Sequence, residues 1–166
     1  AQGTEWGDHC SLLRVSQLAF DKPRQSFLVQ RLDREAFGLM IIAHQQKAAA
    51  QLSTLFQQRK IEKHYEIEVD GDVEWQKLTI NTPLDGKHAV SHFTKRTFDA
   101  DKNRTKLDVS IETGRMHQIR RHCASIGHPV SGDSRYGKKT ADGLQLKASR
   151  LAFDCPITHK KQMFSC

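Results

Sequence analysis

Two segments of the chain alternate apolar and charged residues, and this pattern constrains the fold more than any other feature. In residues 65–69, Tyr65, Ile67 and Val69 are separated by two glutamates. In residues 105–112, Leu107, Val109 and Ile111 occupy every second position. A period of two residues is typical of a strand with one face toward a core. The sequence therefore predicts two half-buried strands.

Helical patterns accompany these strands. Apolar residues recur at helical spacing over residues 46–59, which predicts an amphipathic helix. A second helix is predicted over residues 115–125, because Gly127 and Pro129 follow it as stop signals. Shorter strands are predicted at residues 26–29, 39–43 and 89–98, and residues 144–153 fit a helix or an extended segment.

Many strands and few helices predict an α+β fold around a mixed, mostly antiparallel sheet with flanking helices. The 166 residues are expected to form a single domain, residues 1–166, long enough to bury a core. Residues 1–25 show little periodicity and are the hardest part to interpret. No internal repeat, linker or low-complexity tract separates the chain into parts.

Charge and cysteine content limit the class of protein. The net charge is +7 and the pI is about 9.4, which suits a polyanionic partner. The four cysteines form no CxxC pair, so free thiols in a reducing compartment are expected. No apolar run approaches the roughly 18 residues that span a bilayer. No signal peptide is evident at the N-terminus, and we expect a cytoplasmic protein.

The segment Gln30-Arg31-Leu32-Asp33-Arg34 places one aspartate between two arginines, ahead of Gly38 and an apolar run. A carboxylate flanked by guanidinium groups stays ionised at neutral pH, because nearby opposite charge favours the charged form. Such a carboxylate can act as a nucleophile, as a base or as the organiser of a phosphate site. The alternative is an ion pair on a surface loop, which the pentapeptide alone would favour.

The predicted helix over residues 115–125 carries several cations. Met116, Ile119, Cys123 and Ile126 form its apolar stripe, and Arg120 lies at the edge of that stripe. A partly buried arginine needs an anionic partner, and Asp33 is a candidate. Two alternatives remain open: the arginines extend into water, or Arg115 and the helix N-terminus hold a phosphate.

Tyr65 lies near the start of a strand, where a tyrosine is most often a core ring with its hydroxyl at the edge. The functional alternative is a stacking platform for a base that has left its helix. The nine histidines show no HxxxH or HExxH arrangement, so no metal site is predicted.

Taken together, these motifs resemble the RluA family of RNA pseudouridine synthases. They follow one another in family order and cover roughly residues 29–158. The series consists of Arg31-Leu32-Asp33 with Gly38, Lys63-x-Tyr65 with Gly71, Gly86-Lys87-x-Ala89-x-Ser91, Thr113-Gly114-Arg115-x-His117-Gln118-Ile119-Arg120-x-His122, Gly127-x-Pro129-x-x-Gly132-Asp133-x-x-Tyr136-Gly137, and Leu146-x-Ala148-x-x-Leu151-x-Phe153-x-x-Pro156-x-Thr158. An ordered series is far more specific than any single motif.

The resemblance implies a role for each site residue. Asp33 would be the catalytic aspartate that attacks the target uridine, Tyr65 would stack on the flipped base, and Arg120 would pair with Asp33. Leu151 would close the apolar side of the pocket. The family needs no cofactor and no metal. Structured RNA, either rRNA or tRNA, would be the partner of a monomeric enzyme, and the residues expected to contact it are Arg31, Arg34, Arg115, His117 and Gln118.

The sequence departs from the family pattern at several positions. The family usually has His in place of Gln30, Lys147 and Cys155, and Thr-Ser in place of Ala36-Phe37. These changes motivate a second hypothesis, a catalytically degenerate RNA-binding module on the same scaffold. A carboxylate-based nucleoside hydrolase is a third option, and the lack of a second acid beside Asp33 argues against it.

Overall fold

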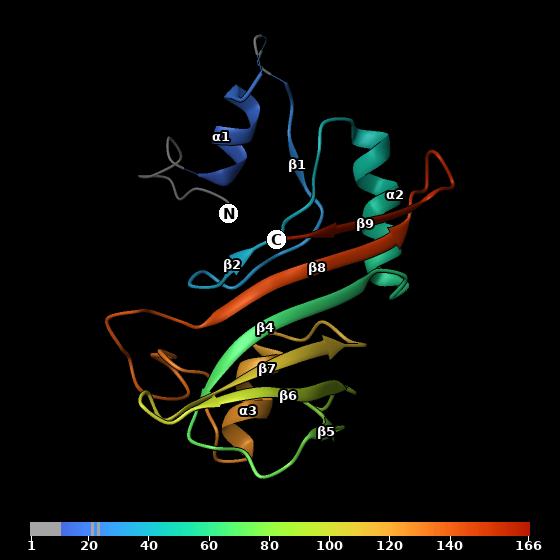
Figure 1. Ribbon diagram of the computed structural model, residues 1–166. Helices are drawn as coiled ribbons and strands as arrows, with labels where there is room; N and C mark the ends of the chain where they lie inside the picture. The colour runs from blue at the N-terminus through green and yellow to red at the C-terminus, as the bar shows by residue number, and fades with distance from the viewer. Residues whose placement is uncertain (1–10, 21, 23) are drawn as a thin grey trace. The chain divides into compact units, whose positions relative to one another are not determined.

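The computed structural model describes residues 11–20, 22 and 24–166, and Figure 1 shows their helices and strands. The chain forms two compact units. The larger one consists of Glu35–Leu39, Glu62–Ala152 and Met163–Cys166. The smaller one consists of the described residues up to Arg34 together with Met40–Ile61 and Phe153–Gln162.

The main sheet confirms the predicted α+β class. Its strands follow the order β2-β8-β4-β7-β6-β5, and β9 also pairs with β8. Only β2 runs parallel to its neighbour β8 among the strand pairs whose direction is known, and the others are antiparallel. The bounds are β2 (Phe37–Gly38), β4 (Glu62–Asp70), β5 (Lys77–Ile80), β6 (Ser91–Asp99), β7 (Arg104–Ile111), β8 (Leu146–Asp154) and β9 (Lys161–Ser165).

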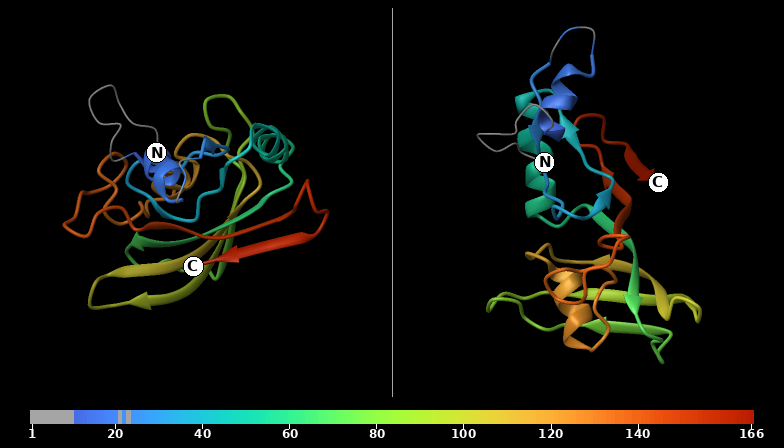
Figure 2. Two further views of the ribbon diagram at one scale, coloured as in Figure 1. Left: turned by 90° about the horizontal axis from the view of Figure 1, so that it is seen from above. Right: turned by 90° about the vertical axis from the view of Figure 1, so that its left-hand side faces the viewer.

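The two alternating segments pair with each other at the centre of this sheet, as β4 and β7. Their register places Tyr65 opposite Val109 and Ile67 opposite Leu107, so the apolar positions of both strands share one face. Helix α3 (Gln118–Ser125) lies along the sheet near β6 and β7 in Figures 1 and 2. The buried core of this unit comprises Ile67, Val69, Val73, Ile80, Phe93, Leu107, Val109, Ile119, Cys123, Val130, Leu144 and Leu146.

Helix α3 begins three residues later than the sequence predicts. His117, the residue before it, has a φ of 51°, so the segment Gly114–His117 turns instead of continuing the helix. The predicted apolar stripe is therefore wrong at Met116, which lies outside the helix and is 56% exposed. Ile119 and Cys123 are buried as expected.

The smaller unit contains α1 (Leu12–Leu18), β1 (Phe27–Leu28), β3 (Ile42–Ala43) and α2 (Gln46–Gln57). Strands β1 and β3 pair antiparallel. The helix predicted over residues 46–59 is confirmed as α2, and the strand predicted at residues 26–29 is confirmed in shorter form. The expectation of a buried strand over residues 39–43 is wrong for most of its length, because only Ile42–Ala43 is extended and only Ala43 is buried.

The C-terminal segment that fitted a helix or an extended conformation is strand β8. The short strand β5 and helix α1 have no counterpart in the sequence prediction. Over the described residues, no helix combines the length and the apolar character that a membrane span requires.

Candidate active site

Asp33 lies in the irregular segment that follows β1 in the smaller unit, as the sequence predicts. Its side chain is half-buried, while Arg31 and Arg34 on either side are exposed. Asp33 is thus partly shielded from water, and the two arginines beside it face solvent. This arrangement suits a positioned acid with cationic flanks that can meet a polyanion.

Tyr65 and Leu151 lie on one face of the sheet in the larger unit. Leu151 of β8 stands opposite Lys63 of β4, and Tyr65 follows two residues later on the same side of β4. The register shifts between His64 and Tyr65, so one extra residue of β8 is accommodated at this point. A bulge of this kind re-aims the side chains beside it. Leu151 is buried, and Tyr65 packs against the core of the unit.

Arg120 projects from α3 and is only 5% exposed, so the prediction that it is partly buried is confirmed. Its Nε donates to Asp133 Oδ2 at 2.8 Å and its Nη2 donates to Asp133 Oδ1 at 2.7 Å. Asp133 is fully buried. The structure therefore identifies an anionic partner for Arg120 that the sequence analysis had named only as a member of the motif series. The expected pairing of Arg120 with Asp33 stays a prediction.

Asp133 is held in its ionised form by its donors. Burial by itself would raise the pKa of this carboxyl, but hydrogen bonds from Arg120 and from the amides of Arg135 and Tyr136 outweigh burial and lower the pKa. The two amides donate to Oδ1 at 2.9 and 3.0 Å. An aspartate that accepts from amides two and three residues later is a common turn device. The motif series contains Asp133, but bonds of this kind leave no pattern in the sequence that would indicate its partners.

Gln118 does not fit the expectation that it contacts RNA. It is 3% exposed, and its Oε1 accepts from Thr113 Oγ1 at 2.7 Å and from the Arg115 amide at 3.1 Å. Its Nε2 donates to Val90 O at 2.8 Å and to Ser91 Oγ at 3.0 Å. The side-chain amide of Gln118 thus has all its hydrogen-bond partners inside the protein. These bonds connect the start of α3 to the beginning of β6.

Arg115 and His117 are more accessible than Gln118. Arg115 Nε donates to the carbonyl of His88 at 3.0 Å, and the Arg115 side chain is half-buried. His117 Nδ1 lies 3.1 Å from the hydroxyl of Tyr136, and the two rings meet edge to face. Both residues sit where the chain turns into α3, so they remain candidates for contact with a polyanion.

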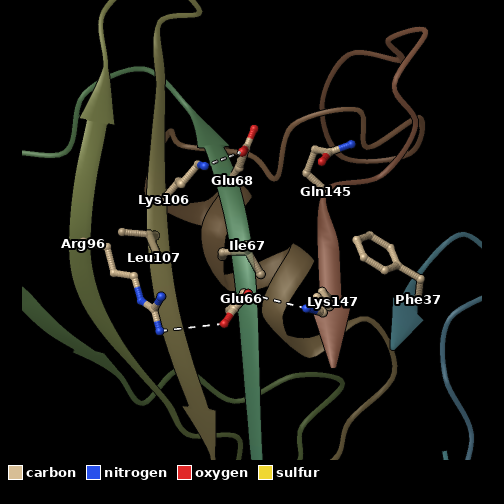
Figure 3. Close-up of a pocket in the computed structure, with 9 residues that line it drawn as sticks. All are labelled: Phe37, Glu66, Ile67, Glu68, Arg96, Lys106, Leu107, Gln145 and Lys147. Carbon is tan, nitrogen blue, oxygen red and sulfur yellow. Dashed lines mark ion pairs between the residues drawn. The ribbon is translucent and has the colours of Figure 1, made fainter. Parts of the chain in front are cut away.

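A hollow of about 150 Å³ lies on the other face of the sheet, and Figure 3 shows its lining. Glu66 forms ion pairs with Arg96 and Lys147, and Glu68 pairs with Lys106. Ion pairs at a solvent-accessible surface contribute little to stability. None of the predicted catalytic residues lines this hollow.

Within residues 11–20, 22 and 24–166, no three His, Cys, Asp or Glu side chains gather as metal ligands. Cys123, Cys155 and Cys166 are free thiols, while Cys10 lies outside the described residues. Burial raises the pKa of the Cys123 thiol, so this group stays protonated.

Comparison with known proteins shows which family this chain resembles in sequence. A family model described as RNA pseudouridylate synthase matches residues 1–125. An uncharacterized RNA pseudouridine synthase of Aquifex aeolicus is 40% identical over 128 residues, which cover 69% of this chain and 40% of that protein. The ribosomal large subunit pseudouridine synthase D of Zymomonas mobilis is 33% identical over 163 residues, covering 82% of this chain and 51% of that protein. The chain thus spans about half the length of the curated relatives it matches.

Solved structures agree on the fold. Human RNA pseudouridylate synthase domain containing 1 superimposes with a TM-score of 0.74 at 22% identity, covering 85% of this chain and 68% of the human one. Human RNA pseudouridylate synthase domain containing 4 gives a TM-score of 0.68 at 20% identity, covering 87% and 71%. At this identity the likeness concerns the fold alone.

Proposed function

The chain belongs to the RNA pseudouridylate synthase family, as its resemblance to the RluA group implied, and we propose that it isomerises uridine to pseudouridine in structured RNA. The family match over residues 1–125 is the observation that carries this proposal. The substrate would be specific uridines of rRNA or tRNA, and the enzyme would act as a cytoplasmic monomer without a cofactor. Residues 1–166 would act as one catalytic domain.

Asp33 is the proposed nucleophile. It attacks C1′ of the target uridine as the bond between C1′ and N1 breaks, and the detached uracil turns. C5 then bonds to C1′, and the bond between C1′ and the Asp33 oxygen breaks, which restores the carboxylate. N1 gains a proton and C5 loses one, so the net reaction is an isomerisation with no second substrate. This chemistry needs an ionised carboxylate and an enclosed site that retains the base. The half-buried position of Asp33 in its loop supports the assignment.

Tyr65, Leu151 and Arg120 take the remaining roles at the reacting centre. Tyr65 stacks on the flipped base and assists removal of the proton from C5, and Leu151 supplies an apolar wall beside it. Their shared face on the β4–β8 pair supports this division. Arg120 pairs with Asp33 and supplies the opposite charge. A guanidinium has five N–H donors, so the pair with Asp133 is compatible with a second carboxylate.

Contact with the RNA backbone is assigned to cations around these residues. Arg31 and Arg34 are exposed beside Asp33, and Arg115 and His117 lie at the start of α3. Such contacts orient the RNA without reading its sequence. The net charge of +7 supports a partner with many phosphates.

Tritium release tests the proposal. The substrate is RNA from cells that lack this protein, labelled with uridine tritiated at C5, because formation of the new bond expels that hydrogen. The parent protein is expected to release tritium and Asp33→Asn is expected to release none. Glu35→Gln is the matched control, since it removes an exposed carboxylate two residues away. Release by Asp33→Asn at the parental rate would refute Asp33 as the nucleophile.

A catalytically degenerate RNA-binding module is the second candidate. Two positions at which the sequence departs from the family pattern, Phe37 and Lys147, are register partners in the parallel β2–β8 pair. Phe37 is exposed, and an aromatic ring beside a cation can hold single-stranded RNA by stacking. This candidate predicts salt-dependent RNA binding with no tritium release from any transcript.

A further inference from the structure

The buried carboxylate of Asp133 has no part in the proposed reaction, although it makes more hydrogen bonds than a simple ion pair requires. Both of its oxygens accept from Arg120, and Oδ1 also accepts from the amides of Arg135 and Tyr136. All these groups belong to the larger unit. A buried carboxylate with four donors is fixed in position. The planar guanidinium of Arg120 donates to both oxygens, and the two amides hold Oδ1 from another direction.

This carboxylate fixes the orientation of a guanidinium. The two parallel bonds to Nε and Nη2 define the plane of the Arg120 head group, which is buried and cannot exchange its partner for water. The Tyr136 ring lies 5.3 Å from Arg120 Cζ and closes one side of the group. Tyr136 in turn meets His117 through its hydroxyl. The loop that follows Gly132 therefore acts as a clamp on Arg120.

We infer that Asp133 is a positioning residue: it fixes the orientation of the Arg120 guanidinium that the proposed reaction uses. The inference rests on the proposed function, in which Arg120 pairs with Asp33. Asp133 does not touch the substrate, and its effect on the reaction passes through Arg120. Its contribution is geometric, since a reacting group displaced by about 1 Å can slow a reaction about a hundred-fold.

The next residue of the helix provides a matched control. Arg121 donates from Nη1 and Nη2 to the two oxygens of Asp85 at 2.8 and 3.0 Å, so it forms the same fork as Arg120. Asp85 is exposed and sits in a tight turn with Gly86, with a φ of 53°. Asparagine suits this turn conformation at least as well as aspartate. Asp85→Asn therefore removes a bidentate pair while leaving the local backbone undisturbed.

The experiment compares Asp133→Asn, Asp85→Asn and the parent protein in the tritium-release assay, with folding checked by circular dichroism. The amide of Asp133→Asn keeps Oδ1 and sets an N–H against the N–H of Arg120 Nε, which displaces the guanidinium. We expect kcat to fall about a hundred-fold with KM little changed, because the lost interaction serves the transition state. Asp85→Asn is expected to match the parent in both constants.

A double variant separates positioning from a general structural role. If Asp133 acts through Arg120, then Arg120→Ala combined with Asp133→Asn is no slower than Arg120→Ala alone. The inference would be overturned if the fold-loss in kcat of the double variant equalled the product of the two single-variant losses. A parental kcat for folded Asp133→Asn would overturn it as well. Should Asp133→Asn fail to fold, Asp133→Glu keeps the charge and displaces the guanidinium by one methylene. Asp133→Glu is expected to lose kcat, and a parental kcat would count against the inference.

The failure of this inference can be told apart from the failure of the proposed function. If the parent releases no tritium, both fall together. If the parent is active and Asp33→Asn is inactive while Asp133→Asn retains the parental kcat, only the positioning role of Asp133 is lost.

Discussion

Arg120 and Arg121 are neighbours on one helix, and each forms a two-pronged pair with one aspartate, yet the two pairs differ in burial. The Arg120–Asp133 pair is shielded from solvent, while Asp85 in the other pair is exposed. The apolar stripe of α3 predicts this difference, because Arg120 borders it and Arg121 faces away. Bond geometry alone therefore does not identify a functional arginine. Burial decides which pair is rigid and costly to break.

The largest expected effect is on stability when the buried pair is broken. Arg120→Ala leaves the Asp133 carboxylate buried without its cation, which costs about 3–5 kcal/mol of unfolding free energy. Arg121→Ala exposes Asp85 to water that already solvates it, so only a small change is expected. Urea unfolding of both variants measures the difference. Equal losses in the two variants would mean that burial does not separate the pairs.

Glycines beside the two aspartates allow the clamp to be disturbed without changing a charge. A Cβ on Gly132 would lie 1.8 Å from the carbonyl oxygen of Gly143, whereas a Cβ on Gly86 would meet nothing within 4 Å. Both have positive φ, so alanine costs about 1–2 kcal/mol of backbone strain at either position. Thermal unfolding should show a larger loss for Gly132→Ala than for Gly86→Ala. The reverse order would contradict the tight packing of the Asp133 loop.

Acid titration sharpens the comparison further. Because the pKa of Asp133 is lowered in the folded protein, its ionised form contributes stability above the unfolded value of about 3.9, and this contribution is lost as the pH falls through the folded pKa. Asp133→Asn should be less stable than the parent at pH 7 and should lose less stability on acidification. Unfolding free energies measured from pH 7 downward test this. Parallel curves for parent and variant would exclude a linked ionisation at Asp133.

The smallest effect is expected for the exposed pair. Asp85→Asn should leave the unfolding midpoint close to that of the parent at physiological salt, and any difference should vanish near 1 M salt, where the screening length is about 3 Å. Asp133→Asn should keep its deficit at the same salt concentration, since a buried pair is weakly screened. A deficit that salt abolishes in both variants would remove the distinction.

Much of the fold follows from local patterns. The alternation in β4 and β7 and the helical period in α2 specify those elements, because each depends on which face meets the core. Strand β2 depends on pairing with β8, more than a hundred residues away, and its two residues carry no period of their own. Helix α3 starts late because Gln118 binds Thr113 and Arg115, and periodicity does not record such bonds.

The candidate site, like the fold, could be predicted from the sequence only in part. The motif series is the source of the proposed site residues Asp33, Tyr65, Arg120 and Leu151. Side-chain spacing predicted that Arg120 is partly buried, and the structure confirms it. Spacing could not identify Asp133 as its partner, because thirteen positions separate the two residues and the contact depends on how the loop folds back. The internal hydrogen bonds of Gln118 were missed for a similar reason, since Val90 and Ser91 become its neighbours only in the folded chain.

Site-resolved mapping of pseudouridine tests the central claim most directly. RNA from cells lacking the protein is incubated with the purified parent or with Asp33→Asn, and each uridine is then examined for conversion to its C-glycoside. The account predicts new pseudouridines at defined positions with the parent and none with Asp33→Asn. No new pseudouridine with the folded parent, or the same positions modified by both proteins, would contradict it.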